Sequence, residues 1–198
     1  MDRMKVGILA YGSFIPDPGW EIENARTRII RDVETPFCIE FARKSKGRMG
    51  APTLVPVEVG GARVRGQVFE MNLSEKEATD VLYRREINKV GSDKKYKRPD
   101  TPGGDSVLVE RIPDFAGLDV VLYTKIAANI DKLTPDKLAC YAICSVTKNN
   151  LGRDGITYLL DAKKARIQTP LSADYEAAIL RRTGCETLEH AREQLLES

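Results

Sequence analysis

The chain has 198 residues, of which 42% are hydrophobic and 30% are charged, and 31 basic side chains nearly balance 29 acidic ones. A chain of this size can bury one sizeable core, so we expect a single domain over residues 1–198. The net charge of +2 provides no global field for nucleic acid or an anionic membrane, and no apolar run approaches the roughly 18 residues that span a bilayer. We therefore expect a cytoplasmic protein without a membrane partner.

Short strand-like runs separated by Gly, Pro and Asp turns dominate the first third of the chain. Such runs favour a mainly antiparallel β-sheet or β-barrel. The predicted strands are residues 5–10, 27–30, 36–41, 53–59 and 62–71.

A helix is predicted to begin at Ser74, because Ser74 and Glu77 form a capping-box pair and apolar residues follow at helical spacing. Glu86 comes four residues after Leu82 and eight after Ala78. On a continued helix its carboxylate therefore shares the inward face and is partly desolvated.

The segment from Asn88 to Gly117 is polar and rich in Gly and Pro. We interpret it as a mobile insertion, since long loops without structure of their own are usually lids, binding loops or disordered segments. Beyond it the pattern predicts a strand over 118–127, a helix capped by Thr134-Pro135, a helix over 172–183 that ends at Gly184, and a final helix from Thr187.

The apolar strand that ends at Ala10 leads directly into the polar turn Tyr11-Gly12-Ser13-Phe14. Gly12 permits backbone dihedrals closed to other residues and a close approach to a ligand. The backbone amides of Gly12, Ser13 and Phe14 could thus point together at an anion or an oxyanion.

Acid–base chemistry at this turn is expected to use a carboxylate, because the only histidine, His190, lies near the far end of the chain. Glu86 is the best candidate, with Glu70 and Glu110 as fallbacks. An ordinary ion pair between Glu86 and Arg84, Arg85 or a nearby lysine is the structural alternative.

Read together, Tyr11-Gly12-Ser13-Phe14-Ile15-Pro16-Asp17-Pro18-Gly19 and Arg85-Glu86 resemble the gamma-glutamylcyclotransferase superfamily, nearest its ChaC-like branch. The similarity extends through residues 37–41, 45–48, 66–69 and 152–160, and the region after Glu86 departs from it. The resemblance implies an α+β fold, with a small closed, mainly antiparallel β-barrel and flanking helices. It also implies cleavage of a gamma-glutamyl compound, glutathione being one candidate, to 5-oxoproline.

Such a cyclisation uses the substrate's own α-amino group as the nucleophile, so the site needs only a proton shuttle and an oxyanion cradle. Glu86 would be the general acid and base, and the Tyr11 to Phe14 turn would be the cradle. Ser13 need not be a nucleophile, and the alternative is a turn residue that satisfies local backbone groups. Tyr11 is either a substrate-contacting phenol or a rim aromatic.

A second set of candidate substrate contacts comes from basic and aromatic residues. The turn from Ser45 to Arg48 matches the family's second-strand turn near the pocket mouth, where Arg48 could hold a substrate carboxylate bidentately. A solvated basic loop is the alternative for both residues. Tyr96 in the polar insertion could line the cavity.

No cofactor or metal is expected, since the chain has no glycine-rich nucleotide motif and Cys140 and Cys144 have no further ligand nearby. The remaining functional alternative is a non-catalytic binding module in which the basic cluster of residues 94–98 contacts an acidic partner or nucleic acid. The cluster is short and the total charge is nearly neutral, which argues against a dedicated nucleic-acid domain. The sequence leaves the oligomeric state open.

Overall fold

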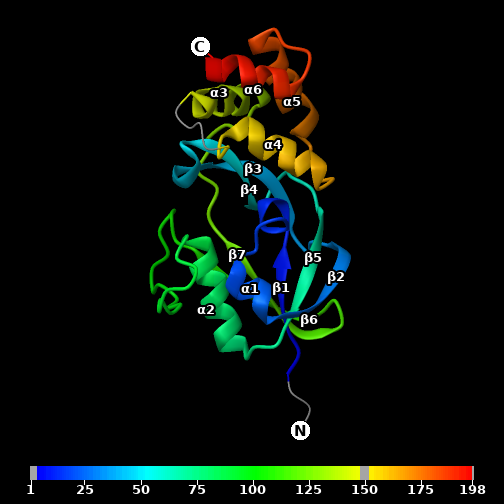
Figure 1. Ribbon diagram of the computed structural model, residues 1–198, viewed down its shortest axis with the longest axis vertical. Coiled ribbons are helices and arrows are strands. Elements are labelled where there is room, and N and C mark those ends of the chain that lie inside the picture. Colours follow the sequence, from blue (N-terminus) through cyan, green and yellow to red (C-terminus); the bar gives the residue numbers. More distant parts are fainter. Residues whose placement is uncertain (1–3, 148–151, 198) are drawn as a thin grey trace. The chain divides into compact units, whose positions relative to one another are not determined.

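The computed structural model describes residues 4–147 and 152–197. The chain divides into two compact units (Figure 1). Unit 1 comprises Met1–Thr35 and Arg65–Ile126, and unit 2 comprises Pro36–Val64 and Ala127–Ser198. Each unit has its own sheet and its own helices, while the single domain expected from the sequence stays a prediction.

Unit 1 is built on a five-stranded sheet in the order β2-β5-β1-β7-β6. The central pair, β1 and β7, is parallel, and every other pair is antiparallel. β1 lies in the middle because its five residues are apolar or glycine and all are buried, as expected for a strand with both faces covered. The strands are β1 (Val6–Ala10), β2 (Arg26–Glu34), β5 (Arg65–Met71), β6 (Leu108–Phe115) and β7 (Leu118–Lys125).

Helix α2 (Glu75–Glu86) packs on β1 and β7 of this sheet, and the short helix α1 (Trp20–Ala25) packs on α2. The predicted capping box is present, since Ser74 Oγ accepts from the Glu77 amide at 3.3 Å and Glu77 Oε2 accepts from the Ser74 amide at 2.9 Å. Ala78 and Leu82 are fully buried in the core that α2 shares with the sheet. This start fixes the register that carries Glu86 to the end of the helix.

Unit 2 pairs a two-stranded antiparallel sheet with four helices. Thr134 caps α3 and Asp154 caps α4, each accepting a hydrogen bond from the amide three residues later. Gly184 ends α5 with a φ of 70°, as its predicted left-handed cap requires. The elements are β3 (Cys38–Ser45), the 3₁₀ turn η2 (Lys46–Arg48), β4 (Ala51–Val57), α3 (Pro135–Val146), α4 (Gly155–Lys164), α5 (Ser172–Thr183) and α6 (Leu188–Glu197).

The predicted α+β class is confirmed. The described strands form the two sheets given above, and the closed barrel stays a prediction. The expectation that residues 88–117 lack regular structure is wrong for Leu108–Phe115, which form β6 in a hairpin with β7. Pro113 obscured this strand in the sequence, yet β6 is an edge strand and there proline costs no ladder hydrogen bond.

Among the described residues, no helix is both long enough and apolar enough to cross a membrane. The four cysteines, Cys38, Cys140, Cys144 and Cys185, are all free thiols.

Candidate active site

The early turn follows β1 at one end of the unit 1 sheet. Residues Gly12–Phe14 form the 3₁₀ turn η1, and Gly12 has a φ of 59°. Within the described part of the chain, the amides of Gly12 and Ser13 have no hydrogen-bond acceptor. These adjacent amides remain available to a ligand anion.

Phe14 differs from the expectation that its backbone amide points at an anion together with those of Gly12 and Ser13. Its N–H donates to the Tyr11 carbonyl at 3.3 Å inside the turn, so it is engaged there. Its ring is buried and lies edge-to-face on Phe69, with centroids 6.1 Å apart. Phe14 thus anchors the turn to the core of unit 1.

Arg85 joins this turn to the end of α2. Its Nη2 donates to the Asp17 carbonyl at 2.7 Å and to the Ser13 carbonyl at 3.4 Å, and its Nε donates to Asp17 at 3.1 Å. Its guanidinium carbon lies 4.4 Å from the centroid of the Phe14 ring. Its Nη1 donates to Glu86 Oε1 at 2.7 Å. One side chain therefore contacts the turn on one side and Glu86 on the other.

Glu86 is the last residue of α2, and its side chain is 14% exposed. The burial predicted from its spacing to Ala78 and Leu82 is confirmed. The ion pair with Arg85 that the sequence left open is also present. The two findings are compatible. Arg85 hydrogen-bonds to the early turn as well as to Glu86, so the ion pair holds the Glu86 carboxylate at the end of α2 that Arg85 links to the turn.

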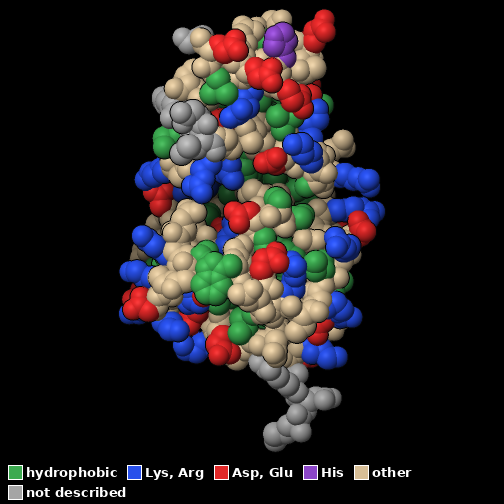
Figure 2. All heavy atoms as spheres, viewed as in Figure 1, with side chains coloured by type: hydrophobic (Ala, Val, Ile, Leu, Met, Phe, Trp, Pro, Cys, Tyr) green, Lys and Arg blue, Asp and Glu red, His purple; other side chains and the backbone are tan. Residues whose placement is uncertain are grey.

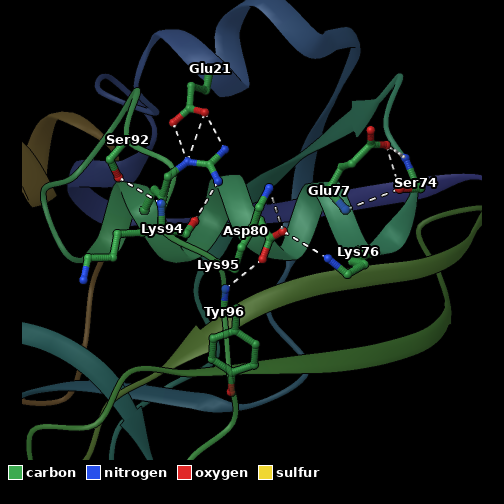
Figure 3. Close-up of polar contacts among 10 residues, drawn as sticks. Glu21, Ser74, Lys76, Glu77, Asp80, Ser92, Lys94, Lys95 and Tyr96 are labelled. Atoms are coloured by element: carbon green, nitrogen blue, oxygen red, sulfur yellow. Dashed lines mark hydrogen bonds and ion pairs between the residues drawn. The ribbon is translucent and has the colours of Figure 1, made fainter.

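Two buried charges on α2 hold the segment of residues 89–98 along the helix (Figure 3). Arg84 pairs with Glu21 of α1 at 2.5 Å, and their side chains are 8% and 13% exposed. Arg84 also donates to the Lys94 carbonyl at 2.9 Å, and Glu21 accepts from the Gly91 amide at 2.8 Å. The hydrogen bond from Arg84 lowers the pKa of the Glu21 carboxyl, and Glu21 in turn raises the pKa of Arg84.

Asp80 is the second of these charges. Its carboxylate accepts from the Tyr96 amide at 2.7 Å and lies 3.6 Å from the ammonium groups of Lys76 and Lys95 (Figure 3). Tyr96 is fixed further by its ring, 5.3 Å from that of Tyr83. Its hydroxyl accepts from the Val109 amide at 3.1 Å. Residues 89–98 are thus bound to the unit 1 core, and a contact of Tyr96 with substrate stays a prediction.

Ser45 and Arg48 belong to unit 2, where Ser45 precedes the turn η2 and Arg48 is its last residue. The Ser45 carbonyl accepts from the Gly50 amide at 2.8 Å. The guanidinium carbon of Arg48 lies 4.7 Å from the centroid of the Tyr158 ring. Their contact with a ligand stays a prediction, so the geometry described for the candidate site comes from unit 1.

The fallback carboxylates are both engaged in ion pairs. Glu70 Oε2 lies 2.8 Å from Arg28 Nε, and Glu110 Oε1 lies 2.7 Å from Arg98 Nη2. Neither has a contact with the early turn like the one Arg85 gives to Glu86. Among the described residues, no group of three or more His, Cys, Asp or Glu side chains could hold a metal ion.

Sequence reasoning missed the roles of two residues at this end of the sheet. Arg85 was noticed as part of a motif, yet its bond to the Ser13 and Asp17 carbonyls depends on the tertiary fold. Gln67 lies in the segment of residues 66–69 that carries the family resemblance, and its place at the end of the sheet likewise depends on the tertiary fold. The sequence signal for Gln67 was a polar side chain at an alternating strand position, since Phe69 and Met71 on the same face of β5 are apolar.

No protein-family model matches the sequence, and no curated protein matches it. A similar solved structure is a gamma glutamyl cyclotransferase specific to glutathione from yeast, which is the kind of protein that the sequence motifs resemble. It is 15% identical, the alignment covers 89% of this chain and 96% of that chain, and the TM-score is 0.46. At this identity and TM-score, the similarity does not establish the activity of the present chain.

Proposed function

We propose that the protein is a gamma-glutamylcyclotransferase, which releases 5-oxoproline from a gamma-glutamyl substrate without a cofactor. One observation carries the proposal. Arg85 contacts both Glu86 and the turn in which the Gly12 and Ser13 amides have no acceptor within the described residues. A proton acceptor and two oxyanion donors at one end of one sheet suit this ring closure.

The reaction begins when Glu86 takes a proton from the substrate's α-ammonium group. The freed amine attacks the side-chain carbonyl carbon, a C–N bond forms, and the carbonyl oxygen becomes an oxyanion that accepts from the Gly12 and Ser13 amides. The bond to the leaving nitrogen then breaks as Glu86 returns the proton to it, and the ring nitrogen releases its second proton to solvent. The products are 5-oxoproline and a free amine, and no water is consumed.

Neither a covalent intermediate nor a histidine takes part in this scheme. Ser13 contributes its amide, and its hydroxyl is left as a turn group. His190 (purple in Figure 2) is an exposed residue of α6 in unit 2. A serine-hydrolase mechanism would need such a base next to the serine.

The leaving group defines the substrate, and glutathione is the first compound to test. Gamma-glutamyl amino acids and gamma-glutamyl amines present the same reacting atoms, and a fold does not choose among them. The sequence departs from the family after Glu86, and we expect residues of that region to determine which leaving group is accepted.

The experiment incubates the purified protein in water enriched in oxygen-18 with glutathione, a gamma-glutamyl amino acid and a gamma-glutamyl amine. We expect 5-oxoproline without the label from at least one substrate, because the ring forms without water. Enzyme-free incubations control for spontaneous cyclisation. Labelled glutamate would show hydrolysis instead, and release of neither product from any substrate would remove the enzymatic function.

A further inference from the structure

Gln67 carries a buried side-chain amide that has no hydrogen-bond partner in the described part of the chain. Gln67 is 7% exposed, and its strand neighbours Gly66 and Val68 are also buried. Within the described residues, its carboxamide makes no hydrogen bond. Buried polar groups in native proteins are nearly always paired, so an exception calls for a reason.

The carboxamide is buried but not sealed. Tyr175 Oη is the only fully enclosed side-chain polar atom without a partner in the part of the chain that the structure describes. The amide atoms of Gln67, which also have no partner there, must therefore keep contact with solvent.

Its position is at the same end of the sheet as the early turn. Gln67 is the register partner of Ala10, the last residue of β1 before Tyr11. Strand residues alternate between the faces of a sheet, so Gln67 shares the face of Phe69 and Met71. Both of those belong to the core cluster that contains Ala78 and Leu82 of α2.

Arg85 completes the geometric link. It ties the C-terminal end of α2 to the Ser13 and Asp17 carbonyls, which follow closely after β1. Gln67, the free turn amides and Glu86 therefore belong to one end of one sheet and to the side of it that α2 covers.

A carboxamide offers one acceptor and two donor hydrogens. The α-amino acid head of a gamma-glutamyl compound carries an ammonium donor and a carboxylate acceptor on a single carbon. We propose that Gln67 is a specificity-determining residue that binds this head, its N–H donating to the α-carboxylate and its carbonyl accepting from the α-ammonium. This inference rests on the proposed function and deepens it, since it names the α-amino acid head as the part of the substrate that the protein recognises.

In the free protein the Gln67 carboxamide is left to solvent, and the bound substrate head takes the place of that solvent. Gln67→Met keeps the length of the side chain and removes its polar atoms. We expect kcat/KM for 5-oxoproline release to fall about 10- to 100-fold, as for lost hydrogen bonds to charged groups. The melting temperature should stay close to that of the wild type, because within the described residues the Gln67 carboxamide makes no hydrogen bond that the substitution would break.

A second comparison separates recognition from structure. The substrate is tested beside an analogue in which the α-carboxylate is replaced by a neutral carboxamide. The wild type should prefer the carboxylate, and Gln67→Met should lose most of that preference. Arg65→Met is the matched control, because Arg65 also lies on β5 but its side chain is 71% exposed, in an ion pair with Asp32.

The outcomes are distinct. An active wild type with unchanged kcat/KM and unchanged preference in Gln67→Met would overturn the inference and leave the proposed function standing. A lower melting temperature with the preference retained would assign Gln67 a purely structural role and also overturn it. A wild type that releases no 5-oxoproline from any tested compound would remove the proposed function and this inference with it.

Discussion

Arg85 determines how two distant pieces of the chain meet. Its three nitrogens and the face of its guanidinium are all used, on Glu86, Ser13, Asp17 and Phe14. A planar fork can serve several acceptors at fixed angles, which a lysine ammonium cannot do. Arg85 thus acts through Glu86 and the turn as a positioning residue.

Arg85→Met should lower kcat/KM about tenfold or more, since Glu86 loses its fixed position relative to the turn, and should lower stability by about 1–3 kcal/mol. Arg85→Lys should recover only part of the activity. Steady-state kinetics and urea unfolding measure both effects. Arg111→Met, which breaks the more exposed ion pair of Arg111 with Glu75 on the same helix, is the control. Full activity in Arg85→Met would contradict a positioning role.

Gly12 combines a left-handed backbone with a free amide. At a φ of 59°, an alanine should cost about 1–3 kcal/mol of stability, and the distorted turn should lower kcat/KM further. Gly117→Ala is a matched control, because Gly117 has a φ of 78° in the β6–β7 turn and open space where a Cβ would lie. Equal losses of stability with equal kinetics in the two variants would show that the Gly12 turn has no special role.

The sequence could suggest Glu86 and the early turn as candidate site residues, because helical periodicity and turn chemistry depend on residues that are close together in the chain. It could not show that the Phe14 amide is engaged within the turn, because the conformation of η1 decides this. Gln67 escaped notice for a related reason. Only the pairing of β5 with β1 places its amide beside the end of the first strand.

At the scale of elements, α2 is both a core helix and a frame for its surroundings. Its apolar face packs on the sheet, its end carries Glu86, and Arg84 and Asp80 hold residues 89–98 beside it. The long polar segment expected to be a free insertion is therefore attached at Gly91, Lys94 and Tyr96.

The Glu21–Arg84 pair predicts a pH-dependent stability. Because the folded pKa of Glu21 is lowered from its ordinary value of 4.5, its contribution is fully present above that value and is lost as pH falls through the folded pKa. Glu21→Gln should cost about 3 kcal/mol at neutral pH. The difference from the wild type should shrink as the pH is lowered below 4.5.

Urea unfolding followed by the fluorescence of Trp20, the only tryptophan, measures this difference across pH. Trp20 is a suitable probe because it precedes Glu21 and its ring lies against Gly91. Glu23→Gln, which removes the partner of Arg26 on the same helix, is the control. A Glu21→Gln penalty that does not change with pH would contradict the assigned ion pair.

Elements with strong local signals were predicted well, and three others were missed. Helix α1 has only six residues, too few for a clear period. Strand β6 has a proline and an exposed edge. Helix α4 had a usable signal in Asp154, its N-cap. Its first residue, Gly155, lies so close to α3 that a Cβ would be 2.7 Å from the Ala142 Cα, a contact that only the fold reveals.

At the scale of the whole molecule, composition predicted a chain long enough to bury a sizeable core, and the family resemblance implied the α+β class, which is confirmed. The parallel pairing of β1 with β7 joins segments more than a hundred residues apart, with Val6 opposite Val120. Hydrophobic patterning records which residues are buried but not which strand is the neighbour. The division into two units, each formed from two separate stretches of chain, is unpredictable for the same reason.

The central claim is that Glu86 shuttles the proton in a ring closure at the end of the unit 1 sheet. The most direct test is the rate of 5-oxoproline release by Glu86→Gln, which keeps the shape of the side chain and removes the proton acceptor. With the melting temperature close to that of the wild type, we predict a loss of at least about 100-fold in kcat, as expected for a missing general acid and base. A Glu86→Gln variant that releases 5-oxoproline at the wild-type rate would contradict the claim.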